Sequence, residues 1–187
     1  MRFGLALAIL WASAGLLAVA MEPDSRVRAA IMSISVLINR DFSGYTGAIA
    51  APDVRGALQA ASKATGVDFA YLAANASLES SLDPAAKAKT SSAAGLFQFI
   101  DSTWEDMVER HGAKIGLAKE AEALASGKLS GLERRRIMDL RYDANVAARM
   151  GAEFAAENQR FLRERLGREP EDVDLYLAHF LGPSGAA

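Results

Sequence analysis

The sequence predicts an all-α fold, and three observations support that prediction. Apolar residues recur at helical spacing over most of the chain, for example in residues 143–166. Residues 67–82 leave almost no polar face, which indicates a helix buried at the centre of its domain. Gly66, Pro84 and Gly167 stand where these stretches would end, as expected of helix boundaries. We therefore expect one helical domain built around a central buried helix.

The other helices are placed by the same start and stop signals. Pro52 suits the first turn of a helix. Ser102 or Asp101 can cap a later helix that ends at His111, next to a glycine. Residues 87–94 are small and polar, which predicts a loop or a short hairpin. In chain order, the expected helices cover approximately residues 27–40, 52–65, 67–82, 102–111, 115–126, 132–140, 143–166 and 171–181.

Length and composition restrict the possible classes of function. The chain has 187 residues, no cysteine, two histidines and a formal net charge of −2. That length suits one globular domain with short extensions. The near-neutral balance argues against a nucleic-acid partner, because such proteins need surplus Lys and Arg to displace counterions from phosphate. With only His111 and His179, the ligands of a structural zinc site are missing, and we expect neither a metal nor a cofactor.

The first twenty residues have the pattern of an export signal. Arg2 supplies a positive start, residues 3–20 are apolar, and Ala18-Val19-Ala20 offers a cleavage site after Ala20. A membrane span needs about 20 apolar residues, so a retained anchor is the alternative. After cleavage, no stable membrane insertion is expected, and the protein would be periplasmic or secreted. The expected organisation is a signal peptide (1–20), an N-terminal extension of a helix and a linker (21–51), and the main domain (52–187).

One carboxylate near the end of the central helix contradicts its surroundings. Glu79 lies in the last turn of residues 67–82, where burial and the negative end of the helix dipole both disfavour an ionised side chain. A carboxylic acid that stays protonated can give a proton to a glycosidic oxygen and later take one back. The alternative is a Glu79 that reaches solvent or pairs with Lys87 or Lys89.

The residues that follow Glu79 suit a sugar-binding loop. Gly95 allows close approach of the backbone. Gln98 offers donors and an acceptor for hydroxyl or acetamido groups. The aromatic side chains of Phe97, Phe99 and Trp104 could pack on sugar rings or belong to the core. For Trp104 we favour the core.

Four short segments occur in order along this part of the chain. They are Glu79-Ser80, then Ser92-Ala93-Ala94-Gly95-Leu96-Phe97-Gln98 with Thr103, then Asp143-Ala144-Asn145-Val146 with Gly151, and finally Tyr176-Leu177-Ala178. Together they resemble the catalytic domain of the soluble lytic transglycosylases, which is related to goose-type lysozyme, over about residues 51–181. The resemblance implies a lysozyme-like helical fold in which the central helix carries the catalytic Glu. The sequence departs from the usual pattern at Ser92, in Ile100-Asp101-Ser102, at Leu177 and at His179.

The resemblance implies an enzyme that cleaves peptidoglycan glycan strands with one carboxylate. Glu79 would be the catalytic acid and base, and Tyr176 would hold that acid or the substrate's acetamido group. The bond between N-acetylmuramic acid and N-acetylglucosamine would be cut, leaving a 1,6-anhydro end. The implied substrate-binding or cleft-shaping residues are Ser80, Gly95, Leu96, Phe97, Gln98 and Asn145.

Two other interpretations stay open. A hydrolytic muramidase would act on the same substrate, with Asp83 or Asp101 activating water. An inactive relative would bind peptidoglycan as an assembly factor of a secretion or flagellar apparatus that crosses the wall. Wall turnover and a wall-spanning machine need the same cut, so the biological process is not determined by these residues.

Overall fold

A computed structural model describes residues 52–171, 174, 175, 177 and 178. The leader (1–20), the N-terminal extension (21–51), Tyr176 and His179 lie outside the described residues. The described elements are α2 (Pro52–Thr65), α3 (Phe69–Ser80), α4 (Asp101–His111), the 3-10 turn η4 (Gly112–Ile115), α5 (Ala118–Ser126), α6 (Gly131–Asp139), the 3-10 turn η5 (Leu140–Tyr142) and α7 (Ala144–Leu166). Every named element is helical, so the all-α prediction is confirmed.

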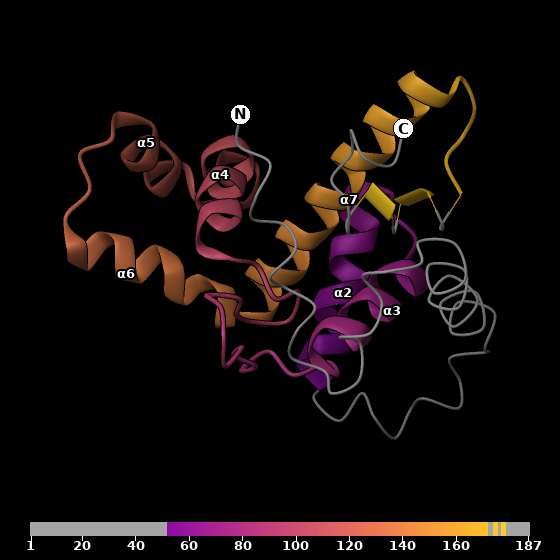
Figure 1. Cartoon of the computed structure of the whole chain (residues 1–187). Coiled ribbons are helices and arrows are strands. Elements are labelled where there is room, and N and C mark those ends of the chain that lie inside the picture. Colours follow the sequence, from indigo (N-terminus) through magenta and orange to yellow (C-terminus); the bar gives the residue numbers. More distant parts are fainter. Residues whose placement is uncertain (1–51, 172–173, 176, 179–187) are drawn as a thin grey trace.

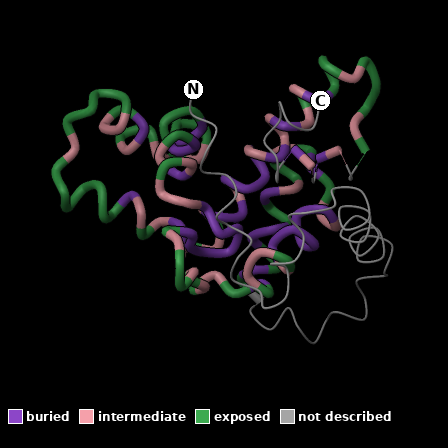
Figure 2. Tube along the Cα trace, in the orientation of Figure 1, coloured by how far each residue is buried: buried purple, intermediate pink, exposed green. Residues whose placement is uncertain are grey.

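The core lies where α2 and α3 pack against the long helix α7 (Figure 1). Buried segments gather at this junction, whereas α5 and α6 are mostly exposed (Figure 2). The predicted apolar face of α2 is confirmed, because Val54, Leu58 and Ala61 are all buried. The facing side of α7 is built from small buried residues, which are Ala147, Ala148, Gly151, Ala152 and Ala155. Small side chains let neighbouring helices approach closely, and the resulting frame supports α3.

Helix α3 is shorter and more open at its end than expected from residues 67–82. It begins after Asp68, whose Oδ1 accepts a hydrogen bond from the amide of Tyr71 at 3.0 Å. It ends because Ser81 and Leu82 adopt positive φ angles of 55° and 65°, a conformation unusual for residues other than glycine. Its buried residues stop at Ala76, so only the first two turns lie in the core.

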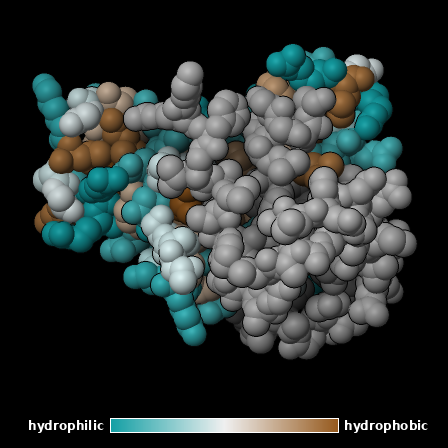
Figure 3. Space-filling view, viewed as in Figure 1, coloured by the Kyte–Doolittle hydropathy of each residue, from teal (hydrophilic) through white to brown (hydrophobic). Residues whose placement is uncertain are grey.

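Helices α5 and α6 form an arm beside this core, joined to it by α4, whose Trp104, Met107 and Val108 are buried in the core (Figure 1). Hydrophobic and hydrophilic side chains mix on its surface (Figure 3), and Leu132 of α6 is 53% exposed. Gly116, with a φ of 87°, ends η4, so α5 starts at Ala118 and not at the predicted residue 115. A capping box between Ser130 and Glu133 starts α6.

The start of α4 corrects a second prediction. Neither Asp101 nor Ser102 caps this helix, because the N-cap position belongs to Ile100, which makes no side-chain cap. Asp101 instead stands inside the first turn, and its carboxylate accepts a hydrogen bond from Arg141 at 2.8 Å.

Helix α7 begins and ends close to where the sequence places it. Asp143 is its N-cap and accepts hydrogen bonds from the amides of Asn145 and Val146, and Gly167 is its left-handed C-cap. Among the described residues, no helix combines the length and the apolar character needed to cross a bilayer. The segment between α3 and α4 contains two isolated antiparallel bridges, Lys87–Ala94 and Ala94–Phe99, so residues 87–94 form a short hairpin, one of the two forms predicted for them.

Candidate active site

Glu79 lies in the last turn of α3, where the helix emerges from the core. Its side chain is half-buried, not fully enclosed as residues 67–82 suggested, and the preceding Leu78 is 44% exposed. The next residue, Ser80, connects this turn to the hairpin segment. Its hydroxyl lies 3.0 Å from the carbonyl oxygen of Ala76 and 2.8 Å from that of Leu96. The helix end that carries Glu79 is therefore tied to the second motif.

The segment from Gly95 to Gln98 forms a tight turn, here called the Gly95–Gln98 turn. The amide of Gln98 donates to the carbonyl oxygen of Gly95 at 3.1 Å, and the φ angle of Gln98 is 49°. Its side-chain Nε2 donates to the carbonyls of Gly95 and Ala86, at 2.8 and 3.2 Å. Both amide protons are thus used inside the protein, so a contact of this side chain with a sugar would have to use Oε1 as an acceptor.

Gly95 has a steric requirement of its own. Its φ angle is 76°, and a Cβ atom at this position would lie 1.9 Å from the carbonyl oxygen of Arg141. The close approach expected at Gly95 therefore brings two segments of this chain together. The amide of Gly95 also donates to the carbonyl oxygen of Ala86 at 2.8 Å, which fixes the turn to the hairpin.

The apolar residues of the second motif belong to the core. Leu96 is fully buried and Phe97 is 3% exposed, so their side chains do not present a face to a bound sugar. The ring of Phe97 packs on Gly151 of α7, where an added Cβ would come within 2.9 Å of ring carbons. Phe99 and Trp104 are buried as well, and their ring centroids are 5.4 Å apart. Of the two alternatives left open for the aromatic side chains, the structure favours core packing, as expected for Trp104.

Arg141 is the residue that the sequence analysis missed. Its side chain is buried and donates to the carbonyls of Ser92, Phe99 and Met138, at 2.9, 3.0 and 3.0 Å, and to the carboxylate of Asp101 at 2.8 Å. Nothing in the surrounding sequence distinguishes this arginine from the many others of the chain.

The other candidate residues from the sequence are Asp83, Asp101, Asn145 and Tyr176. Asp83 uses Oδ1 to accept the amide of Ala85 at 2.8 Å, and Asp101 is paired with Arg141. Asn145 is exposed in the first turn of α7. Tyr176 lies outside the described residues. The groove between α5 and α6 is a separate feature and contains none of these residues; it is lined by Lys119, Glu120, Ala123, Leu129, Glu133, Arg136, Ile137 and Leu140.

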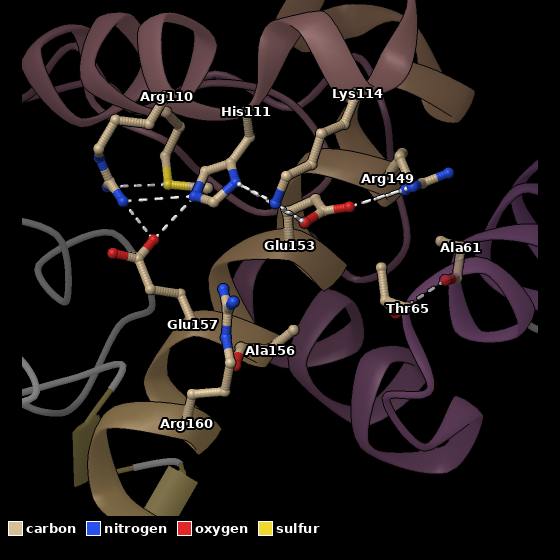
Figure 4. Close-up of polar contacts among 11 residues, drawn as sticks. Ala61, Thr65, Arg110, His111, Lys114, Arg149, Glu153, Ala156, Glu157 and Arg160 are labelled. Carbon is tan, nitrogen blue, oxygen red and sulfur yellow. Dashed lines mark hydrogen bonds and ion pairs between the residues drawn. The ribbon is translucent and has the colours of Figure 1, made fainter. Parts of the chain in front are cut away.

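A second polar cluster joins α4 and η4 to α7, and we call it the α4–α7 charge cluster (Figure 4). Its members are Arg110, His111, Lys114, Arg149, Glu153 and Glu157. His111 is 5% exposed, and its Nε2 lies 2.9 Å from Glu157. The ammonium of Lys114, 3.1 Å from Nδ1, can only donate, so Nδ1 is the acceptor of that contact, and Nε2 also lies 3.3 Å from Nη1 of Arg110.

Both carboxyl groups of this cluster are held in the ionised form. Burial alone would raise the pKa of Glu153, but hydrogen bonds from Arg149 and Lys114 outweigh it, and the pKa lies below its ordinary value. Burial is likewise outweighed at Glu157, whose pKa is lowered by hydrogen bonds from Arg110 and His111. Among the described residues, no group of three His, Cys, Asp or Glu side chains is placed to hold a metal ion.

A helical domain whose central helix carries Glu79 in its last turn, beside a tight glycine turn, has a lysozyme-like helical fold. The family model described as the transglycosylase SLT domain matches residues 56–160, which is more than half of the chain. The chain therefore belongs to the SLT transglycosylase family, whose substrate is peptidoglycan. The matched range contains Glu79, the Gly95–Gln98 turn and Asn145.

Proposed function

We propose that this protein is an exported lytic transglycosylase that cuts the β-1,4 bond between N-acetylmuramic acid and N-acetylglucosamine. One observation carries the proposal. Glu79 stands at the open end of a helix whose first two turns are buried, and the Ser80 hydroxyl ties that end to the Gly95–Gln98 turn at 2.8 Å. Both segments lie inside the range that matches the transglycosylase family.

Glu79 would act first as an acid and then as a base. Its carboxyl proton passes to the glycosidic oxygen as the bond from that oxygen to C1 of the muramic sugar breaks. The acetamido group of the same sugar stabilises the positive charge that develops at C1. The Glu79 carboxylate then takes the proton of the C6 hydroxyl as this oxygen bonds to C1. The acid is regenerated, and no water is consumed.

The arrangement of the other carboxylates supports this one-carboxylate route. Asp83 accepts a backbone amide and Asp101 accepts from Arg141, so each already has a structural partner. An internal hydroxyl attacks at a high effective concentration and needs no second base to activate water. Hydrolysis by a muramidase would use the same Glu79, but it would also need a second carboxylate such as Asp83 or Asp101 to activate water, and its product would carry a reducing end.

Further substrate contacts are proposals of the same kind. The exposed Asn145 would contact hydroxyl or acetamido groups, whereas the buried Gln98 would shape the cleft by holding the turn. Tyr176 would hold Glu79 or the acetamido group. Export through the leader, with cleavage after Ala20, would bring the enzyme to its substrate outside the cytoplasm.

Digestion of purified peptidoglycan tests the proposal. We expect soluble muropeptides with anhydro ends, each one water lighter than the corresponding reducing product in a mass spectrum. A Glu79→Gln chain at the same concentration is the matched control and should release none. Reducing ends would establish the hydrolytic alternative. Absence of any product from the wild-type chain would favour a binding or assembly role.

A further inference from the structure

We infer that Arg141 is a positioning residue for the reaction at Glu79, an inference that rests on the proposed function. Arg141 belongs to η5, far from Glu79 in sequence, and it touches the Gly95–Gln98 turn and its flanks through both its backbone and its side chain. Its task is to hold that turn at one place against α3.

The side chain of Arg141 is held by partners on several sides. Nη1 lies 2.9 Å from the carbonyl oxygen of Ser92, 3.0 Å from that of Phe99 and 2.8 Å from the Asp101 carboxylate. Nε donates to the carbonyl oxygen of Met138 at 3.0 Å. A guanidinium that is only 7% exposed is costly to bury unless such partners are present. Because the group is planar, these contacts set its orientation.

The backbone of Arg141 meets the turn directly. Its carbonyl oxygen occupies the space that a side chain at Gly95 would need, since a Cβ there would lie 1.9 Å away. The side chain grips Ser92 and Phe99, which flank the turn on either side. Phe99 also accepts the amide of Ala94 at 3.2 Å, which closes the loop between these two contacts. Arg141 thus holds the segment 92–99 at both ends, through Ser92 and Phe99, and meets it between them at Gly95.

The position of this segment is passed to Glu79 through Ser80. The Ser80 hydroxyl lies 2.8 Å from the carbonyl oxygen of Leu96, inside the turn. If the Gly95–Gln98 turn shifts, the carbonyl oxygen of Leu96 shifts with it. The last helical turn of α3 then loses the hydrogen bond of Ser80 that holds it to this segment. A small displacement of an acid matters more to the chemical step than to substrate binding. Loss of Arg141 should therefore lower kcat about 10-fold to 100-fold, with KM changed by less than roughly threefold.

Three variants of the full chain test this inference, with kcat and KM measured on peptidoglycan at a temperature where each is folded. Arg141→Met removes every contact of the guanidinium. Arg141→Lys places three N–H donors near the acceptors of Nη1 but loses Met138, so it should recover part of kcat. The matched control is Arg149→Met, which breaks the ion pair with Glu153 in the α4–α7 charge cluster and should leave kcat unchanged.

Hydrogen exchange of backbone amides gives a readout that is independent of activity. The amides of Ala94 and Gln98 donate to carbonyls within residues 92–99, and that of Gly95 donates to Ala86. All three should exchange faster in Arg141→Met but not in Arg149→Met. A wild-type kcat in Arg141→Met, or an equal loss of kcat in Arg149→Met, overturns the inference. If Arg141→Met does not fold, Arg141→Lys decides, and a wild-type kcat with wild-type exchange rates overturns it.

Failure of the proposed function has a different signature. In that case the wild-type chain itself would release no product from peptidoglycan. The exchange experiment would still decide whether Arg141 holds the turn, and unchanged exchange rates in Arg141→Met would overturn that part as well.

Discussion

Two polar networks of this protein meet α4 at opposite ends. Asp101 in its first turn pairs with Arg141 beside the Gly95–Gln98 turn, and Arg110 and His111 in its last turn belong to the α4–α7 charge cluster. The two networks are built in different ways. Around the Gly95–Gln98 turn, the groups that are held are mostly backbone carbonyls, and the donors are Arg141, Gln98 and Ser80. In the α4–α7 charge cluster, side chains bind side chains, and carboxylates face cations. The first network fixes the path of the main chain, whereas the second only joins elements that are already helical.

This difference should separate function from stability. A network that shapes the backbone next to Glu79 can change the geometry of the reaction. A network of ion pairs between α4 and α7 contributes to folding and depends on pH, because its carboxyl groups titrate. Substitutions in the two networks test this separation of function from stability.

Glu79→Gln should have the largest effect, and on activity alone. An amide has no proton to give to a glycosidic oxygen and cannot accept one back, so kcat should fall about 1000-fold. The free energy of unfolding should stay within about 0.5 kcal/mol or rise slightly, because removing a carboxylate from a helix C-terminus relieves its repulsion with the dipole. Muropeptide release and urea unfolding of the same preparation give both numbers. Residual activity within tenfold of wild type would remove Glu79 from the mechanism.

Gly95→Ala should damage both properties. The new Cβ would lie 1.9 Å from the backbone oxygen of Arg141, and the φ angle of 76° is unfavourable for alanine. We expect a loss of about 2–4 kcal/mol in the free energy of unfolding, together with a fall in kcat at temperatures where the chain is still folded.

The matched control is Gly127→Ala, at the C-cap of α5. That glycine has a similar φ angle of 64° but nothing within 4 Å of an added Cβ. The Gly127→Ala variant should lose only about 1 kcal/mol of its free energy of unfolding, and its kcat should not change. Equal losses in the two variants would show that the contact with Arg141 is unimportant.

Glu153→Gln should lower stability and leave kcat unchanged. The Glu153 side chain is 8% exposed and accepts from both Lys114 and Arg149. The amide keeps one acceptor but loses the charge, so about 1–3 kcal/mol of the free energy of unfolding should disappear. Urea unfolding at neutral pH measures the loss. A fall in kcat at full folding would contradict the separation of the two networks.

Features of the fold that depend on residues close together in the sequence could be predicted. The spacing of Val54, Leu58 and Ala61 identified the buried face of α2, and Gly167 identified the end of α7. The end of α3 could not be predicted, because Ser81 and Leu82 adopt left-handed conformations that glycine normally occupies. Tertiary contacts impose these angles, and local propensity carries no sign of them.

The site was predicted only in part for a related reason. A buried Phe97 and a sugar-stacking Phe97 look alike in a sequence, and only the contact with Gly151 distinguishes them. Arg141 binds the carbonyl of Ser92, which is 49 residues away, and the acceptor is a backbone atom that every residue has. No pattern of side chains in the sequence predicts such a hydrogen bond. Glu79 stays the proposed acid: its type conflicts with its position at the end of an apolar helix, and the motifs that follow it along the chain favour that interpretation.

Acid should weaken the α4–α7 charge cluster, because its two carboxylates gain protons. The pKa values of Glu153 and Glu157 are lowered in the folded protein, from an ordinary value of 4.5. The unfolded chain therefore binds more protons in this range, and stability falls as the pH drops below about 4.5 towards the folded-state values. Urea unfolding of the wild type and of a Glu153→Gln, Glu157→Gln double variant, at pH 7 and at pH 3.5, measures the difference. The double variant should lose less stability between the two pH values, because the other carboxyl groups are common to both chains. An equal loss in both would show that these two carboxylates do not set the acid limit of the fold.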